Sequence, residues 1–286
     1  MMLKTIIALF FLVVSGGFEA DKAAGRNAGE IRSGQNASTP AEQQEGPDTA
    51  ASARLDPVHF SNLKWRSIGP AIRSGRISDI AVVESDPDII YVGTAGGGAF
   101  KSVDGGITWD PVFEKEGSSA IGGIAVAQSN PNVVWIATGE PNGRNLVSTS
   151  WGDGVYKSED AGNSWTHMGL RGCQQMGRIA IHANDPQTVF VSCIGSLWDT
   201  AEDNESRGLY RTIDGGGTWQ KVLSAGSRAG VVEVVINPDD PDLLYAGAWQ
   251  RERRDWSWLS TGPESGVFRS IDGGGTWDRL SNGLPT

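Results

Sequence analysis

The sequence has 286 residues, of which 24 are lysine or arginine and 34 are aspartate or glutamate, so its formal net charge is −10. An acidic chain lacks the cationic stripe that a nucleic-acid-binding surface needs, and we expect no nucleic-acid partner. With 39 glycines and 13 prolines, the composition disfavours long helices and favours many short strands joined by turns.

The first residues have the features of an export signal. Lys4 precedes an apolar run at residues 6–14 that is too short to cross a bilayer as a helix, and small residues follow it. We therefore expect residues 1–20 to be a signal peptide, with an uncleaved anchor as the alternative. Removal of the signal would leave a secreted or periplasmic protein with no membrane span.

The next stretch, residues 21–56, contains no aromatic residue and is rich in alanine, glycine, serine, glutamine and glutamate. Such a composition cannot bury enough apolar surface to offset the conformational entropy of the chain. The sequence therefore predicts a disordered linker here and a folded part at residues 57–286.

The folded part repeats one motif about every 55 residues, which starts with serine or threonine, has aspartate at its third position and ends with tryptophan. Its aspartate suits the capping of backbone N–H groups inside a turn, its glycines supply a positive φ, and its tryptophan closes over the turn. We expect these residues to be structural. The four copies contain Asp104 and Trp109, Asp160 and Trp165, Asp214 and Trp219, and Asp272 and Trp277.

Each copy is preceded by two apolar runs that are joined by aspartate or asparagine followed by proline, at residues 86–87, 130–131, 185–186 and 240–241. Proline fits a turn at a strand boundary and interrupts a hydrogen-bonded ladder elsewhere, so these runs predict a second hairpin. Each unit is then a four-stranded antiparallel meander. A tandem series of such sheets is typical of a β-propeller, an all-β fold.

The repeated motif resembles the Asp-box (BNR) repeats of sialidases, of the sortilin ectodomain and of xyloglucanase-type glycoside hydrolases. The stretch at residues 65–70, which leads into residues 75–77, resembles large bacterial secreted proteins that are grouped with sortilin and xyloglucanases. The resemblance implies the propeller fold but no particular activity, because Asp boxes lie in turns that hold blades together.

Propellers of this family usually have more blades than the four that this sequence completes. The sequence therefore predicts a part of a larger propeller, or an exposed sheet edge that takes the remaining blades or another chain. A closed ring of four blades is the alternative. Residues 63–68, which contain Trp65, predict one more outer strand without a blade of its own.

In such meanders the Asp boxes and proline turns share one end of each blade, and the connections between the second and third strands lie at the other end. Three of these connections are long, and they contain the tryptophans that lie outside the repeated positions. Indoles on one face form a platform for sugar rings or anchors for a peptide, and arginines orient the ligand. The alternative is that these side chains pack the loops together. The candidates are Trp151, Trp198, Trp249, Trp256, Trp258, Arg144 and Arg251.

A second candidate site lies at the central axis, at the residue just before each innermost apolar run. These positions hold Asp79, Gly123, Arg178 and Glu233. The mixed charges predict either a grip on a polar ligand or a salt-bridge network that joins the blades.

The resemblance to xyloglucanases implies a catalytic aspartate just after the second strand of the first blade, where this sequence has Ala95. Glycoside hydrolysis needs two carboxyl groups about 5 to 10 Å apart, and alanine supplies none. The resemblance also implies that the second acid comes from a second propeller. Sialidase chemistry would need a tyrosine nucleophile, and all four tyrosines occupy repeated strand positions.

Other chemistry has little support in the sequence. The three histidines lack metal-ligand spacing, and we expect neither a metal site nor a cofactor. Cys173 and Cys193 fall near one end of the third blade, and they are either bridged or free. The sequence thus predicts a non-catalytic propeller that binds a glycan or a polypeptide, and the alternative is a xyloglucanase-like hydrolase that needs sequence beyond residue 286.

Overall fold

The structure is a computed structural model that describes residues 76–283, except residues 142–149, 197, 199–204 and 255. The described residues form strands and turns, and none of them belongs to a helix long and apolar enough to span a membrane. The predicted signal peptide, the predicted linker and the strand expected around Trp65 lie outside the described residues, as does Arg144.

The strands form four sheets that follow one another along the chain, and we call them blades 1 to 4. Blade 1 contains β1 (Ile77–Val82), β2 (Ile90–Thr94), β3 (Ala99–Ser102) and β4 (Asp110–Pro111). Blade 2 contains β5 (Ile121–Val126), β6 (Val134–Thr138), β7 (Val155–Ser158) and β8 (Thr166–His167).

Blade 3 contains β9 (Met176–His182), β10 (Asp185–Cys193), β11 (Gly208–Thr212) and β12 (Gln220–Leu223). Blade 4 contains β13 (Ala229–Ile236), β14 (Leu244–Gln250), β17 (Gly266–Ser270) and β18 (Asp278–Leu280). Between β14 and β17 the chain forms one extra hairpin of β15 (Glu252–Arg253) and β16 (Trp258–Leu259), which we call the arm.

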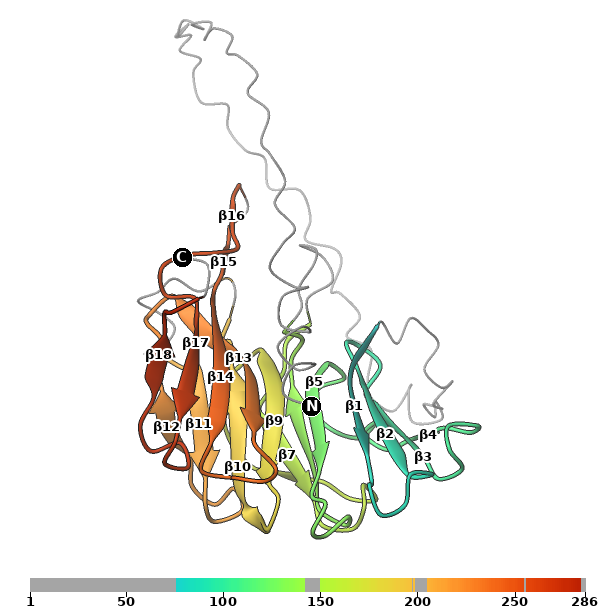
Figure 1. Ribbon diagram of the computed structural model, residues 1–286. Coiled ribbons are helices and arrows are strands. Elements are labelled where there is room, and N and C mark those ends of the chain that lie inside the picture. The colour runs from blue at the N-terminus through green and yellow to red at the C-terminus, as the bar shows by residue number, and fades with distance from the viewer. Residues whose placement is uncertain (1–75, 142–149, 197, 199–204, 255, 284–286) are drawn as a thin grey trace, which may run out of the picture. The chain divides into compact units, whose positions relative to one another are not determined.

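Every blade is an antiparallel meander, as the repeats predict. The first strands of the blades lie against one another, β5 on β1, β9 on β5 and β13 on β9. The blades follow one another around an arc, from blade 1 at the right of Figure 1 to blade 4 at the left. Strands β1 and β13 do not pack together as the other first strands do, so the arc is open between blades 4 and 1.

The hydrophobic core lies between the blades. One cluster joins blades 1 and 2 around Tyr91 and Ile136, a second joins blades 2 and 3 around Trp135 and Val191, and a third joins blades 3 and 4 around Phe190. Because each blade alternates side chains between its two faces, it buries one set against each neighbour. Stacking of consecutive blades therefore supplies most of the buried apolar surface.

Close packing of the first strands depends on glycine. A Cβ atom at Gly123 would lie 2.3 Å from the carbonyl oxygen of Gly177, and one at Gly177 would lie 2.1 Å from the carbonyl oxygen of Val232. Only glycine allows β5, β9 and β13 to approach so closely. Each first strand also has a register shift beside its axial residue, which turns that side chain out of the regular alternation.

The Asp boxes form the turns between the third and fourth strands. In blade 1, Asp104 Oδ1 accepts hydrogen bonds from Ser102 Oγ at 2.8 Å and from the Thr108 amide at 2.9 Å, and Oδ2 accepts one from Thr108 Oγ1 at 2.6 Å. The same bonds recur at Asp160, Asp214 and Asp272. Each box carboxylate accepts hydrogen bonds from the threonine or serine that follows it, and these bonds favour its charged form. They lower the pKa of Asp104, Asp160 and Asp214 to about 2, and they also lower the pKa of Asp272.

Two of the box tryptophans reach farther than the sequence predicted. The indole of Trp165 donates to the carbonyl oxygen of Val112 at 2.7 Å, and that of Trp219 donates to the carbonyl oxygen of Met168 at 2.7 Å. Both acceptors belong to the preceding blade. These indoles therefore join neighbouring blades in addition to closing their own turns.

One predicted turn is wrong. In blade 3 the hairpin turns at residues 183–184, and β10 begins at Asp185, which pairs with His182. Asp185 and Pro186 therefore lie in the strand. A register shift between Asp185 and Val189 accommodates the proline, which lacks the N–H group that a regular ladder uses.

The two cysteines form a disulfide. Cys173 precedes β9, Cys193 ends β10, and their Cα atoms are 5.6 Å apart. Plain hairpin register would leave them out of step, but a shift between Val191 and Cys193 brings Cys193 opposite Met176, close to the turn that contains Cys173. This register shift explains why the two cysteines are bridged and not free, which the sequence left open.

Candidate functional site

The two ends of the blades differ in structure. At one end, the amide of the residue after the box aspartate donates to the turn between the first two strands, as Gly105 does to the Asp88 carbonyl oxygen at 3.0 Å. The equivalent bond recurs in all four blades and makes this end regular. The opposite end, which we call the upper face, carries the connections between the second and third strands, and the arm stands there at the top of Figure 1.

Three of the predicted tryptophans meet two arginines on the upper face. The guanidinium carbon of Arg251 lies 4.6 Å from the ring centroid of Trp249 and 5.9 Å from that of Trp258, and the guanidinium carbon of Arg253 lies 5.0 Å from Trp258 and 5.9 Å from Trp198. Indoles and guanidinium groups therefore alternate, as cation–π contacts favour. We call these five residues the Trp–Arg ladder.

The ladder is fixed to the rest of the molecule through Arg251. Its Nη1 donates to the carbonyl oxygen of Pro141 at 2.8 Å, so the arm of blade 4 contacts the long connection of blade 2. Arg251 and Arg253 are both buried. Burial and the neighbouring charge of Arg253 lower the pKa of Arg251 to about 10, which leaves its guanidinium charged at neutral pH.

Two carboxylates hold the base of the arm. Glu252 is buried and forms an ion pair with Arg228, with 2.5 Å between Oε1 and Nε, and hydrogen bonding to that arginine lowers the pKa of Glu252. Glu264 Oε2 accepts hydrogen bonds from the amides of Arg228 at 2.7 Å and Ala229 at 2.9 Å. Both carboxylates are therefore engaged in contacts that hold the base of the arm.

The five predicted tryptophans divide into two groups. Trp198 and Trp249 are partly buried, and Trp249 also donates its Nε1–H to the Ser260 carbonyl oxygen at 2.6 Å. Trp151 and Trp258 are more than half exposed, and Trp256 near the tip of the arm is 83% exposed. Packing of loops accounts for the first group, whereas the second group presents open indole surface.

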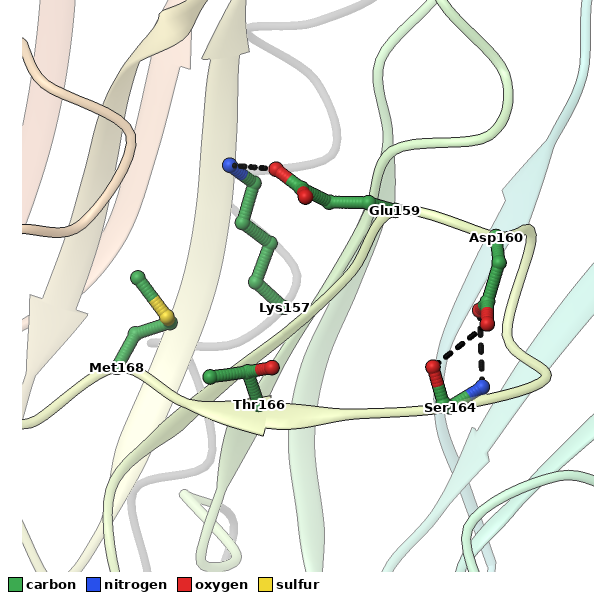
Figure 2. Close-up of a pocket in the computed structure, with 6 residues that line it drawn as sticks. All are labelled: Lys157, Glu159, Asp160, Ser164, Thr166 and Met168. Carbon is green, nitrogen blue, oxygen red and sulfur yellow. Dashed lines mark hydrogen bonds and ion pairs between the residues drawn. The ribbon is translucent and has the colours of Figure 1, made fainter.

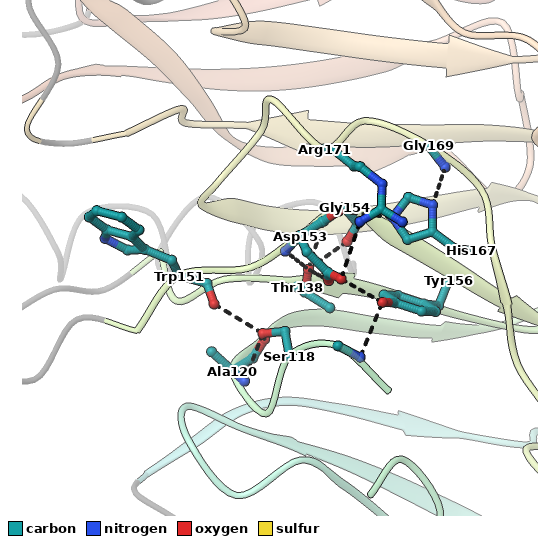
Figure 3. A network of polar contacts seen from close by, with 11 residues as sticks. Ser118, Ala120, Thr138, Trp151, Asp153, Gly154, Tyr156, His167, Gly169 and Arg171 are labelled. Atoms are coloured by element: carbon teal, nitrogen blue, oxygen red, sulfur yellow. Dashed lines mark hydrogen bonds and ion pairs between the residues drawn. The ribbon is translucent and has the colours of Figure 1, made fainter. Parts of the chain in front are cut away.

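Trp151 stands beside a polar network in blade 2, shown in Figure 3. Its carbonyl oxygen accepts a hydrogen bond from Ser118 Oγ at 3.0 Å. Two residues later, Asp153 Oδ2 accepts the hydroxyl of Tyr156 at 2.7 Å and lies 3.7 Å from Arg171 Nη1. Burial and then this hydrogen bond raise the pKa of Tyr156 to about 12, so Tyr156 remains a proton donor at neutral pH.

His167 belongs to the same network. The Gly169 amide donates to its Nδ1 at 3.1 Å, so the proton of the neutral ring lies on Nε2, which donates to the Asp153 carbonyl oxygen at 2.9 Å. The Thr138 hydroxyl accepts the amides of Asp153 and Gly154. The network therefore fixes the start of β7 and engages the Asp153 carboxylate.

The axial residues form a salt-bridge network. Arg178 Nε lies 2.8 Å from Glu233 Oε1, and Arg178 Nη1 pairs with Asp79 Oδ1. Asp79 Oδ2 also accepts the amide of Ile124 at 3.0 Å. These contacts join the first strands of all four blades. Burial alone would lower the pKa of Arg178, but Glu233 and Asp79 raise it above its ordinary value.

At the position where the resemblance implies a catalytic aspartate, Ala95 is buried and its amide donates to the Arg76 carbonyl oxygen at 3.0 Å. A carboxylate that the sequence analysis did not select, Glu140, is fully buried nearby in blade 2 and pairs with Arg76. Its position directly after the second strand and a glycine is the only sequence signal for it. In the described part of the chain, no three His, Cys, Asp or Glu side chains converge as metal ligands.

A pocket shown in Figure 2 lies away from the upper face, beside the Asp box of blade 2. Its charged groups are paired: Lys157 Nζ lies 2.7 Å from Glu159 Oε1, and Asp160 accepts the hydroxyl of Ser164 at 2.6 Å. The pocket is therefore largely part of the turn structure.

Comparisons with known proteins agree with this architecture. No family model matches the sequence. The chain is 23% identical over 267 residues to a xyloglucanase from Paenibacillus sp, which covers 84% of this chain and 24% of that protein.

Three solved structures are similar. The first is an ancestral GH74 enzyme, with 20% identity, a TM-score of 0.56 and coverage of 73% of this chain and 26% of that one. The second is the GH74 enzyme of Niastella koreensis, with 20% identity, a TM-score of 0.51 and coverage of 70% and 28%. The third is the GH74 xyloglucanase from Xanthomonas campestris, with 19% identity, a TM-score of 0.51 and coverage of 73% and 30%. These likenesses confirm the propeller fold, and the chain spans about a quarter of the length of the relatives it matches.

Proposed function

We propose that this chain is a carbohydrate-binding β-propeller segment that holds a neutral polysaccharide on its upper face. The observation that carries the proposal is the group of open indoles, Trp151, Trp256 and Trp258, on the face where the blades are least regular. An exposed indole presents a flat apolar surface with a polar edge, which suits the apolar face of a sugar ring. The similarity to proteins named as xyloglucanases supports a glycan over a polypeptide.

The charges of the upper face favour a neutral ligand. Glu252 is neutralised by Arg228, Glu264 is used by backbone amides, and Asp153 is engaged by Tyr156. The chain as a whole carries a formal charge of −10, which repels acidic polysaccharides. Stacking on indoles, with hydrogen bonds from backbone groups at the rim, is then the main source of affinity.

Hydrolysis is the second candidate, and the similarity to xyloglucanases favours it. It needs two carboxyl groups about 5 to 10 Å apart that face the substrate. Ala95 supplies none, and Glu140 is buried against Arg76. The carboxylate that the resemblance implies is therefore missing, and hydrolysis would need an acid pair at other positions.

Export agrees with this function. A polysaccharide ligand is met outside the cytoplasm, and the Cys173–Cys193 disulfide suits an oxidising compartment. Together with the apolar run at residues 6–14, these features support a secreted or periplasmic location.

Affinity electrophoresis of the full chain in gels containing xyloglucan, mannan or polygalacturonate tests the proposal, with a reducing-end assay on the same mixtures. We expect retardation by a neutral polysaccharide without new reducing ends. Retardation together with release of reducing ends would show that the chain hydrolyses the polysaccharide, and the binding-only proposal would be wrong. Absence of retardation in every gel, together with binding to an immobilised peptide library, would replace the glycan by a polypeptide.

The variant Trp256→Ala assigns the binding to the upper face. The Trp256 side chain is 83% exposed, so its removal leaves the fold intact, and we expect the Kd for the retained polysaccharide to rise roughly tenfold. The matched control is Ile107→Ala, which removes an equally exposed apolar side chain from the Asp box of blade 1. The control should bind as the unchanged chain does.

A further inference from the structure

Each pair of neighbouring blades is joined by the same contact. An aromatic residue on the second strand of one blade lies under a glycine of the next blade's Asp box. A Cβ atom at Gly216 would lie 2.8 Å from the Trp135 ring, and one at Gly274 would lie 2.7 Å from the Phe190 ring. At Gly162 the distance to the Tyr91 ring would be 3.5 Å, an ordinary contact. Glycine thus lies over the aromatic ring at all three junctions and is required sterically at two of them, so the box and the aromatic residue form a matched plug and socket.

A basic residue accompanies each aromatic residue, and in blades 1 and 3 it bonds to the next Asp box. It lies directly opposite the aromatic residue, on the third strand. In blade 1, Lys101 Nζ donates to the Ala161 carbonyl oxygen in the next Asp box at 2.9 Å. In blade 3, Arg211 Nη1 donates to the carbonyl oxygen of Gly273 at 3.0 Å, which is the equivalent position.

Blade 4 has the same socket, but the described residues provide no plug for it. Tyr245 and Arg269 lie opposite each other as the aromatic and basic residues do in the other blades. The Arg269 Nε atom is buried and makes no hydrogen bond. Tyr245 and Val267 are partly exposed, whereas their counterparts in blade 3, Phe190 and Leu209, are buried. We call this surface, with Leu280, the blade 4 socket.

Blade 1 has the complementary surface at the other end of the arc. Ile80 is 54% exposed, whereas its counterpart in blade 2, Ile124, is 3% exposed. Ile77 and Val82 are exposed in the same way. The indole of Trp109 donates to its own Gly106 carbonyl oxygen at 3.0 Å, whereas those of Trp165 and Trp219 donate to the preceding blade. We call this surface, with the Asp box of blade 1, the blade 1 plug.

We propose that the blade 4 socket binds the blade 1 plug of a second copy of this chain, head to tail. Both halves of the contact are present on one chain and repeat an interface that occurs three times within it. Docking buries the apolar residues of both surfaces and supplies the Arg269 side chain with a carbonyl acceptor. A head-to-tail contact between two arcs is of the heterologous type, and two such contacts close a ring.

Light scattering coupled to gel filtration measures the mass of the full chain in solution. The chain has a mass of 30.4 kDa, and we expect a species of twice that mass at micromolar concentration. A monomer at all concentrations up to 100 µM, roughly tenfold above a typical weak dimer constant, would overturn the proposal.

Two variants then identify the surfaces. Ile80→Glu places a charge in the plug, and Tyr245→Glu places one in the socket. We expect each variant to be monomeric alone, with the circular dichroism spectrum of the unchanged chain. The matched control Ile213→Glu alters an exposed apolar residue of blade 3 that belongs to neither surface, and this variant should stay dimeric.

Mixing the two variants tests the head-to-tail arrangement. The Ile80→Glu chain retains an intact socket and the Tyr245→Glu chain an intact plug, so the mixture should form dimers through one remaining contact. Dimers of each variant alone, or monomers in the mixture, would contradict the arrangement.

Discussion

Arg251 on the arm of blade 4 donates a hydrogen bond of 2.8 Å to the carbonyl oxygen of Pro141 in blade 2. The two residues are 110 positions apart, and the contact links connections of blades that are not neighbours in the arc. Arg251 is also a member of the Trp–Arg ladder. One buried side chain thus sets the position of the arm that carries the exposed Trp256 and Trp258.

The arm should loosen when Arg251 is truncated. Arg251→Ala removes two cation–π contacts and the bond to Pro141, so hydrogen exchange in β15 and β16 should become faster while exchange in β13 is unchanged. Arg254→Ala is the matched control, because Arg254 is not part of the ladder and its Nη2 forms a long ion pair of 3.7 Å with Glu252 Oε2. Unchanged arm exchange in Arg251→Ala would contradict the role given to this residue.

The axial network should contribute measurably to stability. Arg178→Ala would leave the buried Asp79 carboxylate without its cationic partner, and we expect a loss of about 1–3 kcal/mol in the free energy of unfolding, measured by urea denaturation. This expected loss is smaller than the roughly 3–5 kcal/mol that breaking a fully buried ion pair costs, because the Arg178 side chain is 42% exposed. Arg171→Ala, which breaks a 3.7 Å pair at an exposed arginine, should cost less than about 1 kcal/mol. Equal costs for the two variants would argue against a special role for the axis.

Acid should unfold the blades through the Asp boxes. The pKa of Asp104, Asp160 and Asp214 is about 2 in the folded chain and near 3.9 in an unfolded one, so their contribution is complete above about pH 4 and is lost as the pH falls toward 2. Asp214→Asn should reduce the pH dependence of the unfolding midpoint between pH 4 and 2. Asp278→Asn serves as the control, since Asp278 is exposed and lies outside the Asp boxes. A slope that is identical in both variants would show that the boxes do not govern acid unfolding.

The disulfide should stabilise blade 3. Cys173 and Cys193 are separated by 20 positions, and a closed loop of this size contributes roughly 3 kcal/mol, so dithiothreitol should lower the unfolding midpoint of the native chain. The double variant Cys173→Ala, Cys193→Ala should show a low midpoint that dithiothreitol does not change. Two titratable thiols in the unreduced native chain would contradict the bridge.

Much of this fold follows from local sequence rules. Asp104 and its three counterparts occupy turns because aspartate, glycine and a hydroxyl residue satisfy the turn's own amides, and this requirement is visible as a repeat. Because consecutive strands of each blade run antiparallel, the connections between them then lie at alternate ends of the blade. The location of the five unrepeated tryptophans on one face could therefore be predicted.

The rest depends on contacts between distant segments. The pairing of Arg251 with Pro141 requires the arm to fold back over another blade, and no spacing rule describes it. The bridge between Cys173 and Cys193 depends on one register shift in β10. The burial of Glu140 depends on the approach of Arg76 from blade 1. Each is a tertiary outcome of loops that are not repeated.

The most direct measurement of the proposed function is a titration of the chain with a xyloglucan oligosaccharide, followed by the indole N–H signals in ¹⁵N–¹H NMR spectra and assigned by single Trp→Phe variants. Binding at the upper face predicts shifts for Trp151, Trp256 and Trp258, while the box indoles of Trp165 and Trp219 remain fixed on their carbonyl acceptors. Shifts confined to the box tryptophans, or no shift at millimolar oligosaccharide, would contradict the account.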